Sequence, residues 1–565
     1  MAERFSRDGP RDWAELMMYP DRNLQDVITI GPNAAKRKEL LGHNYRRGFS
    51  FWSEFSGLRG AEVCMHFNML AIKRAGFHTQ VEPIVEYTNT CDSNKTCQGV
   101  ILNEPANECK AKHLYKEINE RLPLSVTRLI HEMEPKEDCS FDAALASNIA
   151  IVDHLDKHRH KFFCPRTADH CLICNSTHST YSDLQQRLMK NLPVPDDRRV
   201  IGSHVSSECV AFSSRGGHGK GSHHSYVSAG VIAVETKALA EQCALDFTVQ
   251  ENDKNYHVGF LKTLWNGVLG LVSTKQCPSR KGWAIGRERT LIFSWNLTTS
   301  IWHGPTDPTA EFEALFGRSL NCDPDVFFVD STAGVLKELK KTAKKRGFHL
   351  ADDVDVNAID HRQFLPPLMR RRLLDHVAKK EQLQSLGGEF VTDLEQNANF
   401  QGGGATMAAV TTHVAMWNHT LHRLSTSKEL AASHGIPLME PSTGYPFELP
   451  SADVLNGLTK SDLQRLIGNG LHWDVYSAWL LYCLSYLQLK KDVVIMVNEL
   501  GPSSADFADG DIDVDDDAMS CDSGKDSVES EEGSPPNTED GSVHADRQND
   551  YSGSGDDTGS AALSW

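Results

Sequence analysis

The chain has 565 residues, of which 40% are hydrophobic and 24% are charged, and its formal net charge is −18. A chain of this length can bury enough apolar surface for two domains without disulfide or metal cross-links. Its 14 scattered cysteines, the polar segment Met1–Leu40 and the lack of a long apolar run argue against a secreted or membrane-spanning protein. We therefore expect a reducing, intracellular compartment.

The negative charge is concentrated at the C-terminal end. Gly501–Trp565 holds 18 Asp and Glu against two Lys and Arg, which accounts for −16 of the net charge and leaves −2 for the other 500 residues. Few large apolar residues occur among its Asp, Ser and Gly, so residues 496–565 are predicted to form a disordered acidic tail. Such a tail is by default a solubilising spacer; the alternative is that it screens basic surfaces or binds basic partners.

The first predicted unit is a strand, a glycine turn and a helix. Phe49–Phe55 reads as a short apolar strand, Ser56–Gly60 as the turn, and Ala61–Ala75 as the helix. This order is typical of the start of a doubly wound sheet, where the turn approaches a ligand closely. A second strand is predicted over Thr79–Val85, which would place Glu86 at its carboxyl end, where a carboxylate can accept both hydroxyls of a ribose.

Residues 95–195 form a long insertion before the next predicted strand. Within it, Cys164, Cys171, Cys174 and His178 follow a Cys-x6-Cys-x2-Cys-x3-His pattern that could hold a tetrahedral zinc ion. Because the pattern contains only one Cys-x-x-Cys pair, a cysteine-bearing surface insertion without metal is the alternative.

One cysteine is placed in a turn that suits a nucleophile. The apolar run Arg199–Gly202 leads into the small-residue turn Val205–Gly216, which contains Cys209. A thiolate presented by such a turn can attack a bound substrate, although an isolated cysteine is more often a buried structural residue. Downstream, Leu245–Gln250 predicts a buried strand that delivers Glu251.

Three further elements are predicted toward the C-terminal end. Gly286–Ser294 reads as a strand with Arg287 and Arg289 on one side. Arg423–Glu429 and the following Gly-Ile-Pro predict a capped helix with its exit turn, and Leu463–Leu487 predicts a strongly apolar helix.

In this order the segments resemble the motifs of the S-adenosylmethionine-dependent cytosine-5 DNA methyltransferases, over about residues 45–490. Phe55–Gly60 resembles the family's Phe-x-Gly-x-Gly-Gly cofactor loop, and Glu208–Gly216 its Pro-Cys-x-x-Phe-Ser-x-x-Gly nucleophile loop. The other resemblances are Gln250–Asn252 to Glu-Asn-Val, Arg287–Arg289 to Arg-x-Arg, Glu86 to the ribose acid, His113–Ile118 to the adenine-contacting segment, Arg423–Pro437 to Arg-x-Leu-Thr…Gly-x-Pro, and Gly468–Gly470 to the terminal Gly-Asn motif.

The resemblance implies a two-lobed α/β enzyme of the class I methyltransferase type. Its large lobe would contain a Rossmann-like, doubly wound, mostly parallel sheet, and a smaller lobe would recognise the target. The expected division is 1–44 as an N-terminal extension, 45–295 as the catalytic domain with its insertion, 296–422 as the target-recognition lobe, 423–495 as the C-terminal part of the catalytic domain, and 496–565 as the tail.

The resemblance also implies roles for single residues. Cys209 would add to C6 of cytosine and so activate C5 toward the methyl group of S-adenosyl-L-methionine. Glu251 would bond N3 in its protonated form, which requires a raised carboxyl pKa, and Arg287 or Arg289 would hold the cytosine carbonyl oxygen and orient Glu251. The expected cofactor-binding residues are Phe55, Ser56, Gly57, Leu58, Gly60, Glu86, Glu117 and Asn469.

The chain departs from the family pattern at three positions. Glu208 replaces the proline before the cysteine, which leaves the loop less pre-organised and puts a carboxylate beside the thiol, an arrangement that raises a thiol pKa. Asp253 replaces the valine of Glu-Asn-Val, and Arg59 replaces a glycine. A catalytically impaired relative that binds DNA or the cofactor is therefore one alternative.

The expected partner is DNA, without a membrane; protein partners are unknown. The basic runs Lys340–Arg346 and Arg370–Arg372 suit a DNA-facing lobe and a nuclear protein, and the alternative for such runs is a solvated helix face. Because the chemistry of the pocket does not distinguish DNA from RNA, an RNA (tRNA) cytosine-5 methyltransferase on the same fold is the second alternative.

Overall fold

The computed structural model describes residues 7–54, 57–77, 85–105, 109–133, 140–206, 225–383, 391–400, 405–438 and 447–490. Chain contacts divide the protein into Met1–Ile495 and Met496–Trp565, and every described residue lies in the first unit. The predicted acidic tail therefore lies outside the described residues. Among the helices that are described, none has the length and apolarity needed to cross a membrane.

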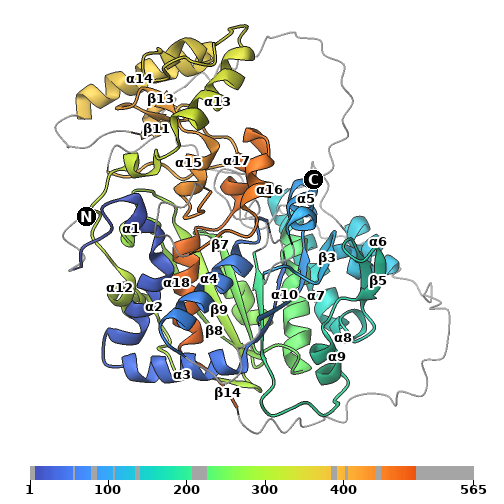
Figure 1. Cartoon of the computed structure of the whole chain (residues 1–565). Helices are drawn as coiled ribbons and strands as arrows, with labels where there is room; N and C mark the ends of the chain where they lie inside the picture. Colours follow the sequence, from blue (N-terminus) through green and yellow to red (C-terminus); the bar gives the residue numbers. More distant parts are fainter. Residues whose placement is uncertain are drawn as a thin grey trace, which may run out of the picture. The chain divides into compact units, whose positions relative to one another are not determined.

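A seven-stranded sheet in the order β3–β2–β1–β6–β7–β9–β8 forms the centre of this unit (Figure 1). Its strands are β1 Phe49–Glu54, β2 Val85–Cys91, β3 His113–Tyr115, β6 Val200–Val205, β7 Phe247–Asp253, β8 Leu269–Gln276 and β9 Arg289–Asn296. The first five strands in the order pair in parallel, whereas β9 is antiparallel to both of its neighbours. The predicted Rossmann-like, mostly parallel sheet is thus confirmed, with its order reversing between β1 and β6.

Helices cover both faces of the sheet, as a parallel sheet requires. Phe293 on β9 belongs to the apolar cluster that contains residues of α2, α4 and α18, whereas its neighbour Ile292 belongs to the cluster that contains residues of α7 and α10. Since successive strand residues point to opposite faces, these two helix groups lie on opposite sides. Their bounds are α2 Tyr19–Thr29, α4 Gly60–Arg74, α7 Phe141–Lys157, α10 Ser225–Glu241 and α18 Trp473–Leu484.

The described residues also form thirteen further α-helices and three small sheets. The helices are α1 Trp13–Met17, α3 Ala34–Arg47, α5 Lys95–Asn103, α6 Leu124–Met133, α8 Arg159–Phe162, α9 Asp183–Met189, α11 Val258–Leu264, α12 Thr309–Phe316, α13 Thr332–Lys344, α14 Pro367–Leu383, α15 Ser427–Ala432, α16 Ala452–Gly457 and α17 Lys460–Asn469. The small sheets pair β4 Ala168–Cys171 with β5 Ser176–Ser179, β10 Ser300–Trp302 with β14 Leu487–Leu489, and β11 Val391–Asp393 with β12 Met416–Asn418 and β13 Arg423–Leu424.

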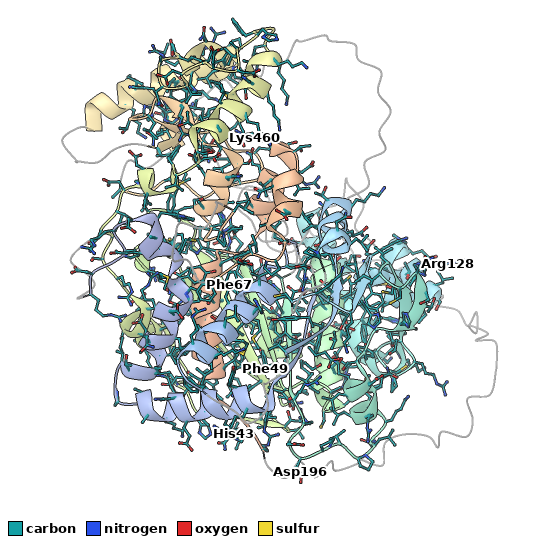
Figure 2. All side chains as sticks on the ribbon, in the orientation of Figure 1. His43, Phe49, Phe67, Arg128, Asp196 and Lys460 are labelled. Carbon is teal, nitrogen blue, oxygen red and sulfur yellow. The ribbon has the colours of Figure 1, made fainter. Side chains whose placement is uncertain are left out.

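Apolar residues of α4, α18 and the sheet pack together in one cluster of the core. All residues of α18 are buried, and Phe67 on α4 lies with its ring centroid 6.2 Å from that of Trp473. Phe67 and Phe49 on β1, both labelled in Figure 2, belong to the same apolar cluster. The single apolar helix predicted over Leu463–Leu487 is wrong, because the chain breaks near Gly470 into α17 and α18.

A buried polar network joins α2, α18 and the segment before β9. Asp474 lies 3.0 Å from Lys281 Nζ, and it accepts hydrogen bonds from Asn23 Nδ2 at 2.7 Å and Trp283 Nε1 at 2.5 Å. Burial lowers the pKa of Lys281 to about 8, against the opposing effect of Asp474. Burial alone would raise the pKa of Asp474, but Lys281 and Arg22 bring it down to about 2. Asp474 is thus an anion that three elements share.

We expect Asp474→Ala to reduce the free energy of unfolding by about 3–5 kcal/mol, since Lys281 would remain buried without its partner. Asp474→Leu combined with Lys281→Met removes both charges, and we expect it to reduce the free energy of unfolding clearly less than Asp474→Ala does. Urea unfolding of the two proteins measures the difference. Equal losses in the single and the double variant would contradict the role of a paired charge.

Candidate active site

The ends of five parallel strands bring the predicted site segments to one edge of the sheet. Glu54 ends β1, Asp92 follows β2, Glu117 lies two residues after β3, Ser206 follows β6, and Glu251 lies near the end of β7. Ligands of open α/β sheets bind at this carboxyl edge, beside the point where the strand order reverses. The order of the strands, rather than the order of the sequence, therefore assembles the candidate site.

Glu251 and Arg289 form an ion pair at this edge. The Arg289 Nε atom lies 3.1 Å from Glu251 Oε1, and the two side chains are 19% and 10% exposed respectively. Glu251 pairs in register with Leu291, so Arg289 reaches the carboxyl diagonally across the antiparallel β7–β9 pair. Oε1 is buried and accepts no hydrogen bond from the described atoms. The carboxyl group therefore retains hydrogen-bonding capacity for a ligand.

Ser206, the residue that follows β6, is hydrogen-bonded to the backbone of Glu251. Ser206 Oγ donates to Glu251 O at 2.9 Å, and Glu251 N donates to Ser206 Oγ at 3.3 Å. Residues 207–224 follow Ser206 and are outside the described residues, so the structure gives no position for Cys209 or Glu208. The same holds for Phe55 and Ser56 of the predicted cofactor turn.

The two predicted arginines have separate contacts. Arg289 is the first residue of β9, whereas Arg287 precedes the strand, so the prediction that both lie on one strand face is wrong. Arg287 is buried, and its Nη2 atom donates to Gly468 O at 3.2 Å and to Gly470 O at 2.7 Å. Arg287 thus holds the backbone after α17, and Arg289 holds Glu251.

The glycine turn before α4 contacts the end of β2 on one side and α18 on the other. Gly57 has φ +52°, its N–H donates to Asp92 Oδ2 at 2.7 Å, and a Cβ there would meet no described atom within 4 Å. A Cβ at Gly60 would lie 2.9 Å from the Trp473 indole nitrogen. Leu58 is buried between them. Among the described residues, the turn therefore leaves space beside Gly57, as a bound cofactor needs.

Arg59 explains how the turn accommodates a side chain where the family has glycine. Its φ of +57° is left-handed, and its buried guanidinium forms ion pairs with Glu62 and Glu104. These contacts direct the side chain into the protein and offset the strain of the left-handed backbone.

Glu86 lies at the opposite end of β2 from the candidate site. It is the second residue of the strand, about 16 Å from the carboxyl edge, and it forms ion pairs with Lys112 and Arg199. Residues 79–84 of the strand predicted over Thr79–Val85 lie outside the described residues, and the described strand β2 begins at Val85. The carboxylate at the expected location is Asp92, which the sequence analysis missed.

The two other predicted cofactor residues are exposed. Glu117 precedes the short 3₁₀ helix η2 (Ile118–Arg121) at the carboxyl edge. Asn469 is the last residue of α17 and follows Gly468, where a Cβ would lie 2.5 Å from the Thr411 carbonyl carbon. Glycine at 468 therefore permits the backbone of Thr411 to approach the end of α17 closely.

Two buried carboxylates, Glu54 and Glu235, contact Arg121, and Glu54 directly precedes the predicted cofactor turn. Arg121 donates to both carboxyl oxygens of Glu54 at 2.8 and 3.0 Å and lies 3.4 Å from Glu235. Desolvation raises the pKa of Glu54 to about 7, although Arg121 acts in the opposite direction. Arg121 belongs to η2, so its ion pair with Glu54 holds the end of β1 against the segment that contains Glu117.

The predicted zinc ligands are only partly brought together. Cys171, Cys174 and His178 lie on the β4–β5 hairpin. The donor atoms that converge are those of Cys174 and His178 together with His113 on β3. Two of the four predicted ligands are thus brought together, and neither Cys164 nor Cys171 is part of this group.

The buried histidines of the described residues include His204 on β6, His434 after α15 and His472 before α18. Desolvation lowers the pKa of His204 and of His472 to about 3 and brings that of His434 well below its usual value. The His204 Nδ1 atom shares a hydrogen bond of 2.8 Å with the Tyr476 hydroxyl.

These histidines predict acid sensitivity. In the unfolded chain the imidazoles gain a proton below pH 6.5, whereas in the folded protein they stay neutral down to about pH 3, so the free energy of unfolding falls as pH drops through this window. Between pH 7.5 and pH 5, the decrease in the free energy of unfolding should be about 2 kcal/mol smaller in His204→Gln than in the unaltered chain. Urea unfolding at pH 7.5 and pH 5 measures it, and an unchanged pH dependence in the variant would contradict the assignment.

The sheet order, with one antiparallel strand inserted next to the edge strand β8, is that of the class I methyltransferase fold. No protein-family model and no curated protein matches the chain. Similar solved structures include the S. pombe Dnmt2 methyltransferase (10% identity, 76% of this chain and 96% of that one, TM-score 0.37) and a Spodoptera frugiperda DNMT2 mutant (13%, 77% and 99%, 0.32). A putative DNA modification methyltransferase from an E. coli prophage is also similar (12%, 78% and 98%, 0.34). Likeness at these TM-scores adds nothing to the assignment of the fold, which rests on the sheet order.

Proposed function

We propose that this chain transfers a methyl group from S-adenosyl-L-methionine to C5 of cytosine in DNA through a covalent cysteine adduct. The observation that carries the proposal is the set of contacts among Ser206, Glu251 and Arg289. Cys209 follows Ser206 by three residues, so covalent reach limits the distance between their Cα atoms to about 11 Å. The predicted nucleophile loop therefore starts beside the predicted acid and guanidinium.

Each group in this set suits one part of the proposed reaction. The Cys209 thiolate would form a bond to cytosine C6, which moves the electrons of the C5–C6 double bond toward C5. Glu251 would hold a proton on N3, and Arg289 would hold the cytosine carbonyl oxygen and orient Glu251. After C5 has gained the methyl group, a base removes the C5 proton, the C5–C6 double bond re-forms, and the thiolate leaves with its electron pair. No residue is assigned as that base.

The carboxyl edge fits the proposed cofactor. S-adenosyl-L-methionine, when bound, supplies an electrophilic methyl group on a sulfonium centre. Gly57 offers open space at a left-handed turn, and Gly60 begins α4, whose N-terminal amides attract negative charge. Asp92 and Glu117 provide carboxylates after β2 and β3, as hydroxyl and amino groups of a nucleoside require. Glu86 is not among these proposed cofactor-binding residues, because it lies at the opposite end of β2.

DNA as the substrate is supported by exposed basic side chains on two helices. Lys341 and Lys344 on α13, and Arg370 and Arg371 on α14, are exposed, whereas Arg372 donates to the Glu395 carbonyl at 2.7 Å. Most of this charge is therefore available to phosphates. The cytosine would have to leave the base stack to reach the pocket, at a cost of a few kcal/mol. We retain 296–422 as the proposed target-recognition lobe.

Transfer of a labelled methyl group to DNA and tRNA, offered in competition, tests the proposal. We expect the label in DNA, and on C5 of cytosine after digestion to nucleosides. Label in tRNA alone would contradict DNA as the substrate and favour the RNA enzyme. The absence of transfer to either polymer would contradict the activity and favour an impaired relative, the alternative that Glu208 suggests.

A further inference from the structure

The β4–β5 hairpin brings two thiols to its tight turn. Cys171 ends β4 opposite Ser176, and Cys174 lies in the turn. Asn175 closes the turn with a left-handed φ of +52°. The N–H of Leu172 in this turn donates to the Leu114 carbonyl of β3 at 2.8 Å. The hairpin is thereby fastened to the edge strand of the main sheet.

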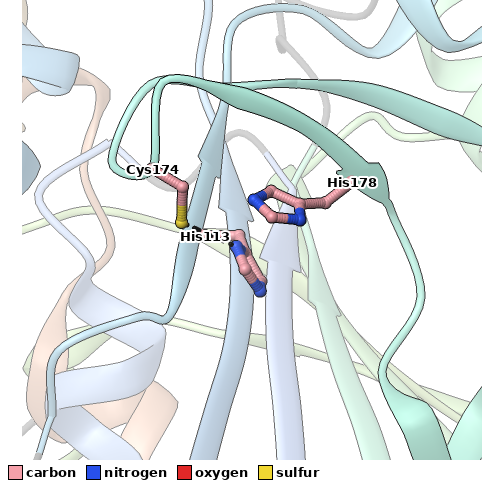
Figure 3. A group of neighbouring side chains, drawn as sticks. All are labelled: His113, Cys174 and His178. Atoms are coloured by element: carbon pink, nitrogen blue, oxygen red, sulfur yellow. Dashed lines mark hydrogen bonds between the residues drawn. The ribbon is translucent and has the colours of Figure 1, made fainter.

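Three donor side chains converge between this hairpin and β3. The donor atoms of His113, Cys174 and His178 all lie within 4.8 Å of one another, and Figure 3 shows the sulfur and the two imidazoles gathered together from three segments. Cys174 Sγ is 3.6 Å from His113 Nδ1. In a tetrahedral zinc site with bonds of about 2.0 Å to nitrogen and 2.3 Å to sulfur, two such ligands are about 3.5 Å apart. The observed distance is therefore that of two ligands of one ion.

A neighbouring hydroxyl orients one of the imidazoles. Ser176 Oγ lies 2.8 Å from His178 Nε2, which leaves Nδ1 of that ring as the donor for a metal. A histidine that binds zinc almost always bonds an oxygen through its other nitrogen, because this bond fixes the tautomer and the direction of the ring. The contact to Ser176 supplies that second bond.

A candidate fourth donor lies on the same hairpin. Cys171 is buried and precedes Cys174 by three residues, but its sulfur is not among the donor atoms that lie within 4.8 Å of one another. Two cysteines spaced Cys-x-x-Cys together with two histidines form one of the standard ligand sets of structural zinc.

We propose that His113, Cys171, Cys174 and His178 bind one zinc ion in a tetrahedral Cys₂His₂ site. The ion would cross-link the hairpin of the insertion to β3, four residues before Glu117, and so stabilise the edge of the sheet beside the proposed cofactor pocket. The site is structural, since all four positions are filled by protein. It is independent of the proposed methyl transfer.

Metal analysis of the full chain, purified under reducing conditions without a histidine tag, tests the proposal. We expect about one zinc ion per chain. Cys174→Ser and His113→Gln should each lose most of this zinc, whereas Cys164→Ser, which changes a nearby thiol outside the group, should retain it. Circular dichroism of each variant identifies loss of the fold.

Cobalt replacement in the unaltered chain keeps the test decisive if a variant fails to fold. After chelation and refilling with Co²⁺, we expect the visible absorption of tetrahedral cobalt and a near-ultraviolet thiolate-to-cobalt band, both removed by one equivalent of Zn²⁺. The proposal would be overturned by a reduced chain that holds no zinc and gives no cobalt bands. It would equally be overturned by bands that persist in folded Cys174→Ser, or by a Cys171–Cys174 disulfide in the protein as purified under reducing conditions.

Discussion

Cys209→Ser is expected to reduce methyl transfer to DNA by about 10⁴-fold or more, because removal of a covalent nucleophile abolishes the route that it opens. A serine hydroxyl is far less acidic than a thiol and would not add to C6 at neutral pH. The measurement is the initial rate of labelled transfer to DNA. Binding of S-adenosyl-L-methionine should be unchanged, since in the proposed reaction the thiol bonds to the base and not to the cofactor.

Cys164→Ser is the matched control for this change, because its thiol lies outside both the proposed active site and the proposed metal group. It should transfer at the rate of the unaltered chain. Transfer by Cys209→Ser at a rate similar to that of the control would rule out residue 209 as the nucleophile.

Glu251→Gln is expected to reduce kcat by about 10²–10⁴-fold, and Arg289→Ala by about 10²–10³-fold, with little change in KM for DNA. Glutamine keeps the shape of the side chain but removes the carboxyl group proposed to bond N3, and alanine removes the guanidinium that lies 3.1 Å from the carboxyl. Because the two side chains act as a pair, the fold reduction of kcat in the double variant should be smaller than the product of the two single fold reductions. Steady-state kinetics on one DNA substrate measure all three variants.

Arg280→Ala is the control for the loss of an arginine outside the proposed site, since Arg280 forms an ion pair with Glu313 and is partly exposed. Its kcat should stay within about twofold of the unaltered chain, as expected for a surface ion pair. A kcat for Arg289→Ala equal to that of the control would remove Arg289 from the reaction.

The parts of the fold that sequence predicted correctly have strong local signals. The apolar run from Phe49 and the glycines that follow predicted β1 and α4 within a residue or two. Thr426 and Glu429 form the expected capping box at the start of α15, and Gly435, with φ +77°, makes the exit turn. In each case the residues that decide the structure are neighbours in the chain.

The error at Glu86 has a physical cause in β2. That strand contains Thr88, Asn89 and Thr90, which are polar and are typical of a turn or an exposed strand in a sequence. In the sheet they are buried and hydrogen-bonded, as Thr88 is to Phe51 O and Thr90 to Ser53. Pairing with a neighbouring strand supplies these partners, and a single sequence does not show the pairing.

Two features of the candidate sites depend on contacts between distant segments. Spacing suggested Cys164 as a metal ligand, whereas His113, one of the three converging donors, comes from β3, a strand far upstream that is hydrogen-bonded to the hairpin. Likewise, periodicity assigned Arg287 and Arg289 to one face, yet the strand begins only at Arg289. The motif located both arginines, and only the structure distinguished their contacts.

Covalent trapping on DNA that contains 5-fluorocytosine tests the central claim most directly. Fluorine replaces the hydrogen that must leave C5, so the thioether to C6 cannot break after methyl transfer. We predict a complex that survives denaturation, requires S-adenosyl-L-methionine, and yields a peptide joined to the base through Cys209. Attachment through any other residue, or methyl transfer to ordinary DNA with no trapped complex on the fluorinated DNA, would contradict it.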